Sequence, residues 1–228
     1  MLTCFEIANY FIWLANDTGY SLSNWKLQKL VYYAQSWHLA LKKKPLFNED
    51  FEAWVHGPVI PALYQEYKEF SGHPIEKNID KEIIKKISSD VIDFLKKIAE
   101  KYLAWDAYEL ANMTHIEKPW KQARGNIPPN QSSRSIIKKD WIEEYYAGRI
   151  EEQEKNTTAI KTGQVTSVDR LVEEALPREL AALQRAEIDF ALLEMLQDPE
   201  YQTEVLKLEI EFAGASWEAL QQFEVLTE

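Results

Sequence analysis

With 228 residues, 46% of them hydrophobic, the chain is long enough for one large domain, or for a domain of ordinary size with an appendage. A single cysteine, Cys4, excludes an internal disulfide. No apolar run approaches the roughly 18 residues that a membrane span requires, and no basic-then-apolar leader opens the sequence. Composition therefore predicts a soluble, cytoplasmic protein.

The charge is divided unevenly along the chain. Residues 1–150 contain 20 basic and 19 acidic side chains, and residues 151–228 contain 6 and 18, which add up to the 26 and 37 of the whole chain. This break in composition predicts a domain over residues 1–150, a linker over 151–164 and an acidic helical C-terminal extension over 165–228. The predicted fold class is mainly α, with a compact multi-helix domain and a short extended or β segment near residues 50–57.

The first two predicted helices have clear local signals. Thr3 and Glu6 have the spacing of a capping box, which predicts a helix that ends before Gly19. The central helix, residues 26–41, has Ser23 as its N-cap. Its apolar stripe comprises Leu27, Leu30, Val31, Ala34, Trp37, His38 and Leu41. Because Tyr32, Tyr33 and Leu39 add apolar bulk on another side, this helix is expected to lie at the centre of the domain.

Alternating and helical patterns follow in turn. Residues 47–61 contain two prolines and an alternating stretch, which predicts a short strand or extended loop. Pro61 is expected to begin a helix that continues to Phe70. Asp90 is the predicted cap of a long helix, and a further helix is expected to begin at Trp105-Asp106. Residues 127–130 are read as a loop, and residues 136–146 as the last helix of the first segment.

The helical spacing of apolar residues is absent just after residue 150 and returns further along the chain. Residues 151–164 are polar and unpatterned, as in a linker. Helical apolar spacing returns after Val168. The candidate partner-binding residues of this extension are Leu180, Leu183, Phe190, Leu193 and Leu196. Such an apolar stripe can gain a few kcal/mol by burial at about 25 cal/mol per Å². It packs either on a partner or on the chain's own domain, and the sequence leaves both open.

The stretch from Thr114 to Arg124 is the best candidate for catalytic chemistry. His115 and Glu117 could form an acid–base pair if a turn brings them together, with His56 as a third member, as in a hydrolase or transferase. The packing interpretation is favoured for each histidine. In it His115 hydrogen-bonds the turn, Trp120 lies in the core, and His56 belongs to a backbone turn shaped by Gly57 and Pro58.

Other kinds of site have weak signals. The four histidines are dispersed and no Cys-x-x-Cys or His-x-x-x-His spacing occurs, so we expect no metal and no cofactor. Paired lysines suggest a solvated face more than a nucleic-acid site, since the acidic extension repels phosphate. That extension suits a basic protein partner better.

Four stretches, in this order, resemble the Panacea domain, the SocA-like or phage-associated antitoxin family: KLQKLVYYAQSWHLAL, FEAWVHGPVIPALYQEY, LANMTHIEKPWKQAR and a closing helix with WIEEYY. The resemblance covers roughly residues 1–146. The residues that match its motifs are Lys26, Leu27, Lys29, Leu30, Tyr33, Ala34, Trp54, His56, Gly57, Pro58, Val59, Leu63, Tyr64, Thr114, His115, Glu117, Pro119, Trp120 and Arg124.

The resemblance implies a mainly helical domain that neutralises a toxin encoded beside it by binding it directly, without an active site. One branch of the family instead delivers its toxin to a ClpXP-type protease. The family accepts many unrelated toxins, so the toxin's identity does not follow. The toxin-binding or scaffold candidates are Trp54, His56, Gly57, Pro58, Thr114, His115, Glu117, Trp120 and Arg124. No catalytic residue is assigned, and the oligomeric state is open.

Overall fold

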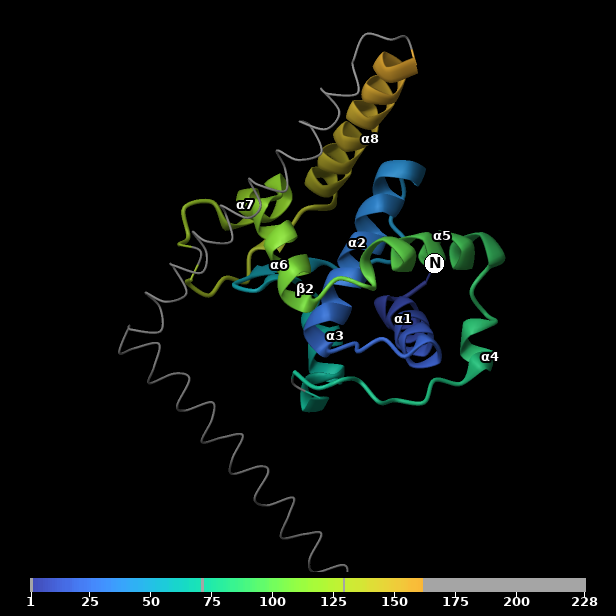
Figure 1. Cartoon of the computed structure of the whole chain (residues 1–228). Helices are drawn as coiled ribbons and strands as arrows, with labels where there is room; N and C mark the ends of the chain where they lie inside the picture. Colours follow the sequence, from blue (N-terminus) through green and yellow to red (C-terminus); the bar gives the residue numbers. More distant parts are fainter. Residues whose placement is uncertain (1, 71, 129, 162–228) are drawn as a thin grey trace, which may run out of the picture. The chain divides into compact units, whose positions relative to one another are not determined.

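A computed structural model describes residues 2–70, 72–128 and 130–161. This part of the chain is mainly helical and contains one small sheet (Figure 1), so the predicted fold class is confirmed for it. The elements are α1 (Cys4–Thr18), α2 (Asn24–Lys42), β1 (Phe51–Trp54), β2 (Gly57–Val59), α3 (Pro61–Glu66), η1 (Lys68–Phe70), α4 (Lys81–Ile84), α5 (Ser89–Tyr102), α6 (Ala107–Ile116), α7 (Lys118–Arg124), β3 (Ile136–Ile137) and α8 (Lys139–Lys161). None of these helices is long and apolar enough to cross a membrane.

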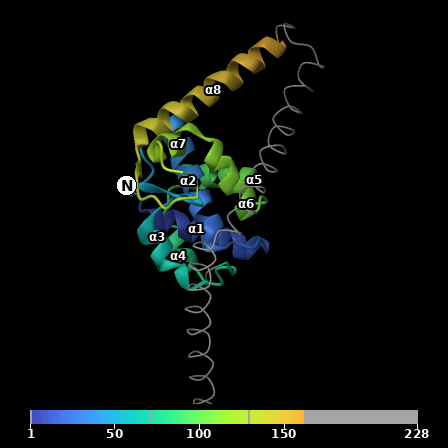
Figure 2. The same cartoon turned by 90° about the vertical axis from the view of Figure 1, so that its left-hand side faces the viewer.

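Helix α2 is the centre of the domain, as the sequence predicts. It packs against α1, α5, α6, α8 and β2, and Figures 1 and 2 show it running among these elements. Every residue from Lys26 to Trp37 is buried. The predicted apolar stripe is wrong at its end, because Leu41 lies in the last helical turn and is 54% exposed. His38 is half-buried and lies with Nδ1 2.7 Å from the Lys44 carbonyl.

Because α2 is buried on all sides from Lys26 to Trp37, the polar side chains of this stretch lie in the core, and several bind loop backbone. Gln35 accepts from the Leu46 amide at 2.7 Å and donates to the Phe47 carbonyl at 2.9 Å. Gln28 accepts from the Ile60 amide at 3.0 Å. Buried backbone groups in loops need such partners. The polar residues of α2 therefore fix the segments that surround it.

Local capping signals set most helix starts. The capping box of Thr3 and Glu6 is present at the start of α1, and Asp106 caps α6 in the same way. Ser88, not Asp90, is the N-cap of α5, and Asp90 lies in the first turn. The predicted helix from Pro61 is shorter than expected, because α3 ends at Glu66 and a separate 3₁₀ turn follows. Helix α4 was not predicted.

The sheet has the order β2–β1–β3 and both pairs are antiparallel. β1 and β2 form a hairpin in which Trp54 pairs with Gly57. In β3, Ile137 pairs with Phe51. The prediction that Ile136 begins a helix is therefore wrong, since these two residues belong to the sheet instead.

Helix α8 also differs from its prediction. It begins at Lys139 and continues to Lys161, so the expected end at Tyr146 is wrong and residues 151–161 are helical. Good helix formers such as Glu, Gln and Lys extend a helix without an apolar stripe. The boundaries 1–150, 151–164 and 165–228 remain predictions. The five apolar candidates between Leu180 and Leu196, and the predicted helices of the extension, lie outside the described residues.

Candidate functional site

Most of the site candidates from the sequence lie in the β1–β2 hairpin or bind it, and Glu117 is the exception. We call Lys29, Gly57, Pro58 and Thr114 the hairpin cluster. Lys29 Nζ donates to the Pro58 carbonyl at 3.0 Å. A Cβ atom on Gly57 would lie 2.6 Å from Thr114 Oγ1 and 2.9 Å from Lys29 Cε, and Gly57 has a φ of 96°. Only glycine suits this position, and the hairpin closes directly onto α2 and α6.

Lys29 is fully buried, and burial lowers its pKa from 10.5 to about 7. Within the described part of the chain, no carboxylate contributes to this shift. Desolvation disfavours a charged ammonium, and a single carbonyl partner compensates only in part. The hairpin cluster therefore contains a lysine whose protonated form destabilises the fold.

This burial predicts a pH dependence of stability. Between pH 7 and 10.5 the unfolded chain binds a proton at Lys29 that the folded chain has lost, so the free energy of unfolding rises with pH in this window. Relative to Lys29→Met, the wild type should gain about 2 to 3 kcal/mol between pH 7 and pH 9. Urea unfolding at both pH values measures this difference.

Lys42→Met is the matched control, since it removes an exposed lysine from the same helix. The burial argument for Lys29 is contradicted if Lys29→Met and Lys42→Met give the same change with pH. A Lys29→Met variant less stable than wild type at pH 7 by several kcal/mol would also contradict it.

His115 lies beside this cluster, at the end of α6. Its ring is 4.4 Å from that of Trp120, and one of its nitrogens hydrogen-bonds the Val55 backbone. Nε2 is buried without a partner. Burial first, and then the charge of Lys29, lower the pKa of His115 to about 3. His115 is therefore neutral at ordinary pH and belongs to the packed base of the hairpin.

Trp120 and Arg124 of α7 hold the hairpin from another side. Trp120 is 5% exposed and its Nε1 donates to the Trp54 carbonyl at 3.0 Å. Arg124 is buried, donates to the Ala53 carbonyl at 3.0 Å and also binds the carbonyl of Pro128. These side chains satisfy backbone acceptors, which is a positioning role.

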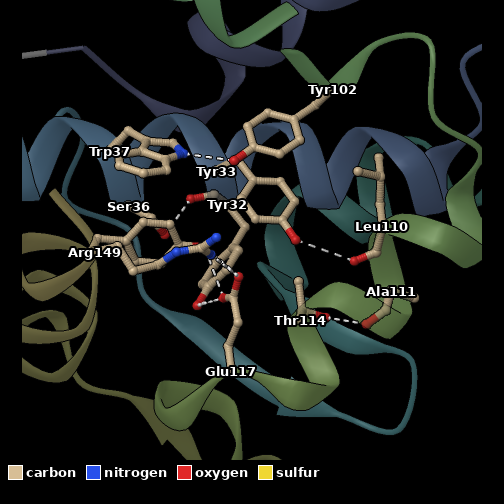
Figure 3. A network of polar contacts seen from close by, with 11 residues as sticks. Tyr32, Tyr33, Ser36, Trp37, Tyr102, Leu110, Ala111, Thr114, Glu117 and Arg149 are labelled. Carbon is tan, nitrogen blue, oxygen red and sulfur yellow. Dashed lines mark hydrogen bonds and ion pairs between the residues drawn. The ribbon is translucent and has the colours of Figure 1, made fainter. Parts of the chain in front are cut away.

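Glu117 lies between α6 and α7 but faces a different environment. It is 1% exposed. Tyr146 donates its hydroxyl to the carboxylate, 2.8 Å from each oxygen, and Tyr32 donates at 3.3 Å. Arg149 Nη1 is 3.8 Å from Oε1. We call Glu117, Tyr32, Tyr146 and Arg149 the carboxyl network; it joins the α6–α7 junction to α2 and α8 (Figure 3).

Burial raises the pKa of Glu117 to about 7, although the bonds from Tyr146 and Tyr32 and the charge of Arg149 act in the opposite direction. Both carboxyl oxygens bind tyrosines, whereas the bonded nitrogen of His115 goes to Val55. The structure thus does not bring His115 and Glu117 together, and the acid–base pair considered from the sequence does not form.

His56 lies at the hairpin tip and is exposed. Trp25 donates Nε1 to the His56 carbonyl at 3.1 Å and its ring packs edge-on at 5.0 Å. Partial burial, and then Lys29, lower the pKa of His56. Of the candidate side chains at the hairpin, His56 is therefore the one most open to a partner.

Several important residues were missed as site candidates from the sequence: Trp25, Lys29, Tyr32, Tyr146 and Arg149. The burial of Lys29 could have been predicted from the sequence, because a helix that is apolar on both sides must also bury the polar residues between those sides. Arg149 had none, since its role depends on where α8 crosses α2. Among the described residues, no group of three or more His, Cys, Asp or Glu could hold a metal ion.

The sequence that builds this site matches a known family model over part of the chain. The sequence profile described as "Antitoxin SocA-like, Panacea domain" matches residues 27–121. Residues 27–121 therefore resemble a Panacea domain. This range lies within the predicted residues 1–146 and runs from α2 to α7, so it includes the hairpin cluster and Glu117. Arg124 follows just after it, and α8 lies beyond it.

A curated relative supports the same assignment. Antitoxin SocA of Caulobacter vibrioides (strain NA1000 / CB15N) is 42% identical over 59 residues, which are 26% of this chain and 31% of the relative. The chain thus matches about a third of that protein's length. No solved structure matches. The resemblance to the Panacea domain thus comes from sequence, and several of its motif residues, among them Lys29, Trp120 and Arg124, bind the backbone of the β1–β2 hairpin.

Proposed function

We propose that this protein is a cytoplasmic antitoxin that neutralises a cognate protein toxin by binding it directly. The observation that carries the proposal is the Panacea match over residues 27–121, whose motif side chains are engaged in holding a scaffold. Lys29, Trp120 and Arg124 each bind hairpin or loop backbone. Such a rigid, preorganised scaffold favours protein recognition, because little conformational freedom is lost on binding.

The acidic extension is proposed as a second binding element. Residues 151–228 have 18 acidic and 6 basic side chains, and a basic surface on the toxin would complement this charge. The apolar candidates Leu180, Leu183, Phe190, Leu193 and Leu196 would supply buried contact area in the manner of a helix in a groove.

The test is co-expression with the protein encoded by the adjacent reading frame. We expect that protein to arrest growth alone, the pair to restore growth, and the two chains to purify as one complex. Persistent toxicity without a complex would contradict neutralisation by binding. Deleting residues 165–228 tests the extension: weaker rescue is expected, whereas unchanged rescue would confine binding to the Panacea domain.

Two other functions predict different results in the same assay. A ClpXP-type adaptor would make the toxin disappear in a protease-dependent way, where binding leaves it intact in an inactive complex. A hydrolase or transferase would lose rescue on His115→Ala while complex formation persists. The packed position of His115 against Trp120 and Val55 favours the binding function over the second of these.

A further inference from the structure

Two cations from different helices lie close together beside the C-terminal half of α2. Lys101 of α5 is exposed, and its Nζ lies 4.6 Å from the centre of the Trp37 ring and 5.3 Å from that of Tyr102. The Trp37 ring is 4.9 Å from that of Tyr146, and the guanidinium carbon of Arg149 on α8 is 6.0 Å from the same tyrosine ring. We call Lys101 and Arg149 the cation pair.

The two cations are near enough to repel each other. Burial first, and then the charge of Arg149, lower the pKa of Lys101. Within the described part of the chain, no carboxylate is among the causes of this shift. The pKa of Arg149 is raised overall, although burial acts against this, so its guanidinium stays charged. The fold thus keeps a like-charge contact that an anion placed between the two side chains would relieve.

Glu117 does not balance the cation pair. Its carboxylate is 3.8 Å from Arg149 Nη1 and also accepts from Tyr146 and Tyr32. Burial raises its pKa to about 7, so part of this negative charge is lost at neutral pH. Even when it is fully ionised, one carboxylate faces two cations. An excess of positive charge therefore remains whichever form Glu117 takes.

The aromatic floor beneath the cation pair is fixed in place. Trp37 Nε1 donates to the Tyr102 hydroxyl at 2.8 Å (Figure 3), and the rings of Tyr102 and Tyr33 stack at 4.2 Å. A partner meets a surface whose shape is set before binding, which lowers the entropic cost of association.

An apolar side chain adjoins the cation pair. Leu41 lies one helical turn after Trp37, on the same side of α2, and is 54% exposed. Arginine and tryptophan with an open apolar neighbour are the composition found at the energetic centre of protein interfaces. The surface therefore matches a peptide segment in which an acidic residue stands next to an apolar one.

We propose that the cation pair and Leu41 form a docking surface for an acidic segment of the toxin, with a carboxylate between Lys101 and Arg149 and an apolar side chain against Leu41. This inference rests on the proposed function. The carboxylate gains attraction from both cations as the interface excludes water. Nucleic acid fits less well, because a run of phosphates would continue over the exposed Glu151 and Glu152 of α8.

The test measures the Kd of the full chain for the protein of the adjacent reading frame by calorimetry. Lys101→Glu is expected to weaken binding about tenfold or more, because its own carboxylate then occupies the place beside Arg149. For the same reason the thermal midpoint of the free chain should not fall. Lys101→Arg keeps the charge and should bind like wild type. Added salt should weaken wild-type binding more than that of Lys101→Glu.

Lys96→Glu is the matched control. Lys96 is an exposed lysine of the same helix, but five positions before Lys101 it points roughly 140° away around the helix axis. This variant changes the net charge equally and should leave Kd unchanged. Leu41→Glu is an independent variant, since it places a carboxylate against the proposed acidic segment from α2. It should also weaken binding about tenfold, and it decides the question if Lys101→Glu lowers the thermal midpoint.

Several results would overturn the inference. The cation pair is not the docking surface if Lys101→Glu and Leu41→Glu bind like wild type, and its charge is not specific if Lys96→Glu is equally weak. Tighter binding by Lys101→Glu would mean that acidic residues of the chain itself cover the surface. A homodimer that Lys101→Glu dissociates would assign it to a second copy, and DNA binding that the same variant abolishes would assign it to phosphates. Wild-type protein that fails to bind the toxin overturns the proposed function as well.

Discussion

Replacing Gly57 by alanine is expected to destabilise the domain by about 3 kcal/mol or more. The new Cβ atom would lie 2.6 Å from Thr114 Oγ1 and 2.9 Å from Lys29 Cε. Neither neighbour moves easily, because Thr114 donates to the Ala111 carbonyl at 2.7 Å and Lys29 is fully buried. Urea unfolding measures the loss, and rescue of growth should weaken in parallel.

Gly19→Ala is the control that separates the clash of a new Cβ atom at Gly57 from the strain of placing alanine at a positive φ. Gly19 also has a positive φ, 76°, but nothing lies within 4 Å of its Cβ position, so its substitution should cost only about 1 kcal/mol. Adding Thr114→Ala to Gly57→Ala should recover part of the lost stability, since it removes the nearest atom. Equal losses for Gly57→Ala and Gly19→Ala would contradict the close packing of the hairpin on α6.

The second large effect is expected at Glu117. Glu117→Ala leaves the hydroxyls of Tyr146 and Tyr32 without this acceptor and opens a cavity between α2, α7 and α8, so it should cost about 3 kcal/mol or more. Glu144→Ala is the control, because Glu144 is an exposed carboxylate on α8. Thermal and urea unfolding at pH 8 compare the two variants.

Glu117→Gln has a different expected result, which depends on pH. The pKa of Glu117 is raised from 4.5 to about 7, so between these values the folded chain binds a proton that the unfolded chain has released. The free energy of unfolding contributed by this residue therefore falls as pH rises from 4.5 to 7, by about 3 kcal/mol, and stays low above pH 7.

The uncharged glutamine removes this pH dependence and keeps one acceptor for the tyrosines. At pH 8 Glu117→Gln should accordingly be much more stable than Glu117→Ala, and close to wild type. Wild-type stability that does not change between pH 5 and pH 7 relative to Glu117→Gln would show that the carboxyl is solvated, contrary to its burial.

Predictions that rest on local signals agree well with the structure. Thr3 with Glu6, and Ser23, form the caps of α1 and α2, because a cap depends on residues within one helical turn. Phe51 and Ala53 are buried in a strand as their alternation predicts. These features need no information from distant parts of the chain.

Predictions that depend on long-range pairing agree less well. The two-residue strand β3 has no pattern of its own, and its place is set by pairing with Phe51 and Glu52, which are more than 80 positions earlier. For helix α8 the prediction fails although the deciding signal is local. Its polar residues after 150 offer no apolar stripe, but their helix propensity is sufficient to continue the helix to Lys161.

The candidate site divides in the same way. The motifs and their order can be recognised from the sequence alone, and they agree with the family match over residues 27–121. The roles of the individual motif residues cannot be predicted from the sequence. His115 and Glu117, for example, are two positions apart but lie in different environments. His115 packs under the hairpin with Trp120, while Glu117 joins α2 and α8 through Tyr32 and Tyr146.

The sequence by itself determined the mainly helical fold, the buried central helix, the short strand before Gly57 and the resemblance of residues 27–121 to the Panacea domain, since these follow from periodicity, caps and ordered motifs. The tertiary structure alone decided that Lys29 is buried against the Pro58 carbonyl with its pKa lowered to about 7, and that Glu117 faces tyrosines. The physical reason is that pKa values and accessibility depend on which side chains other elements bring near, and sequence spacing does not fix that distance.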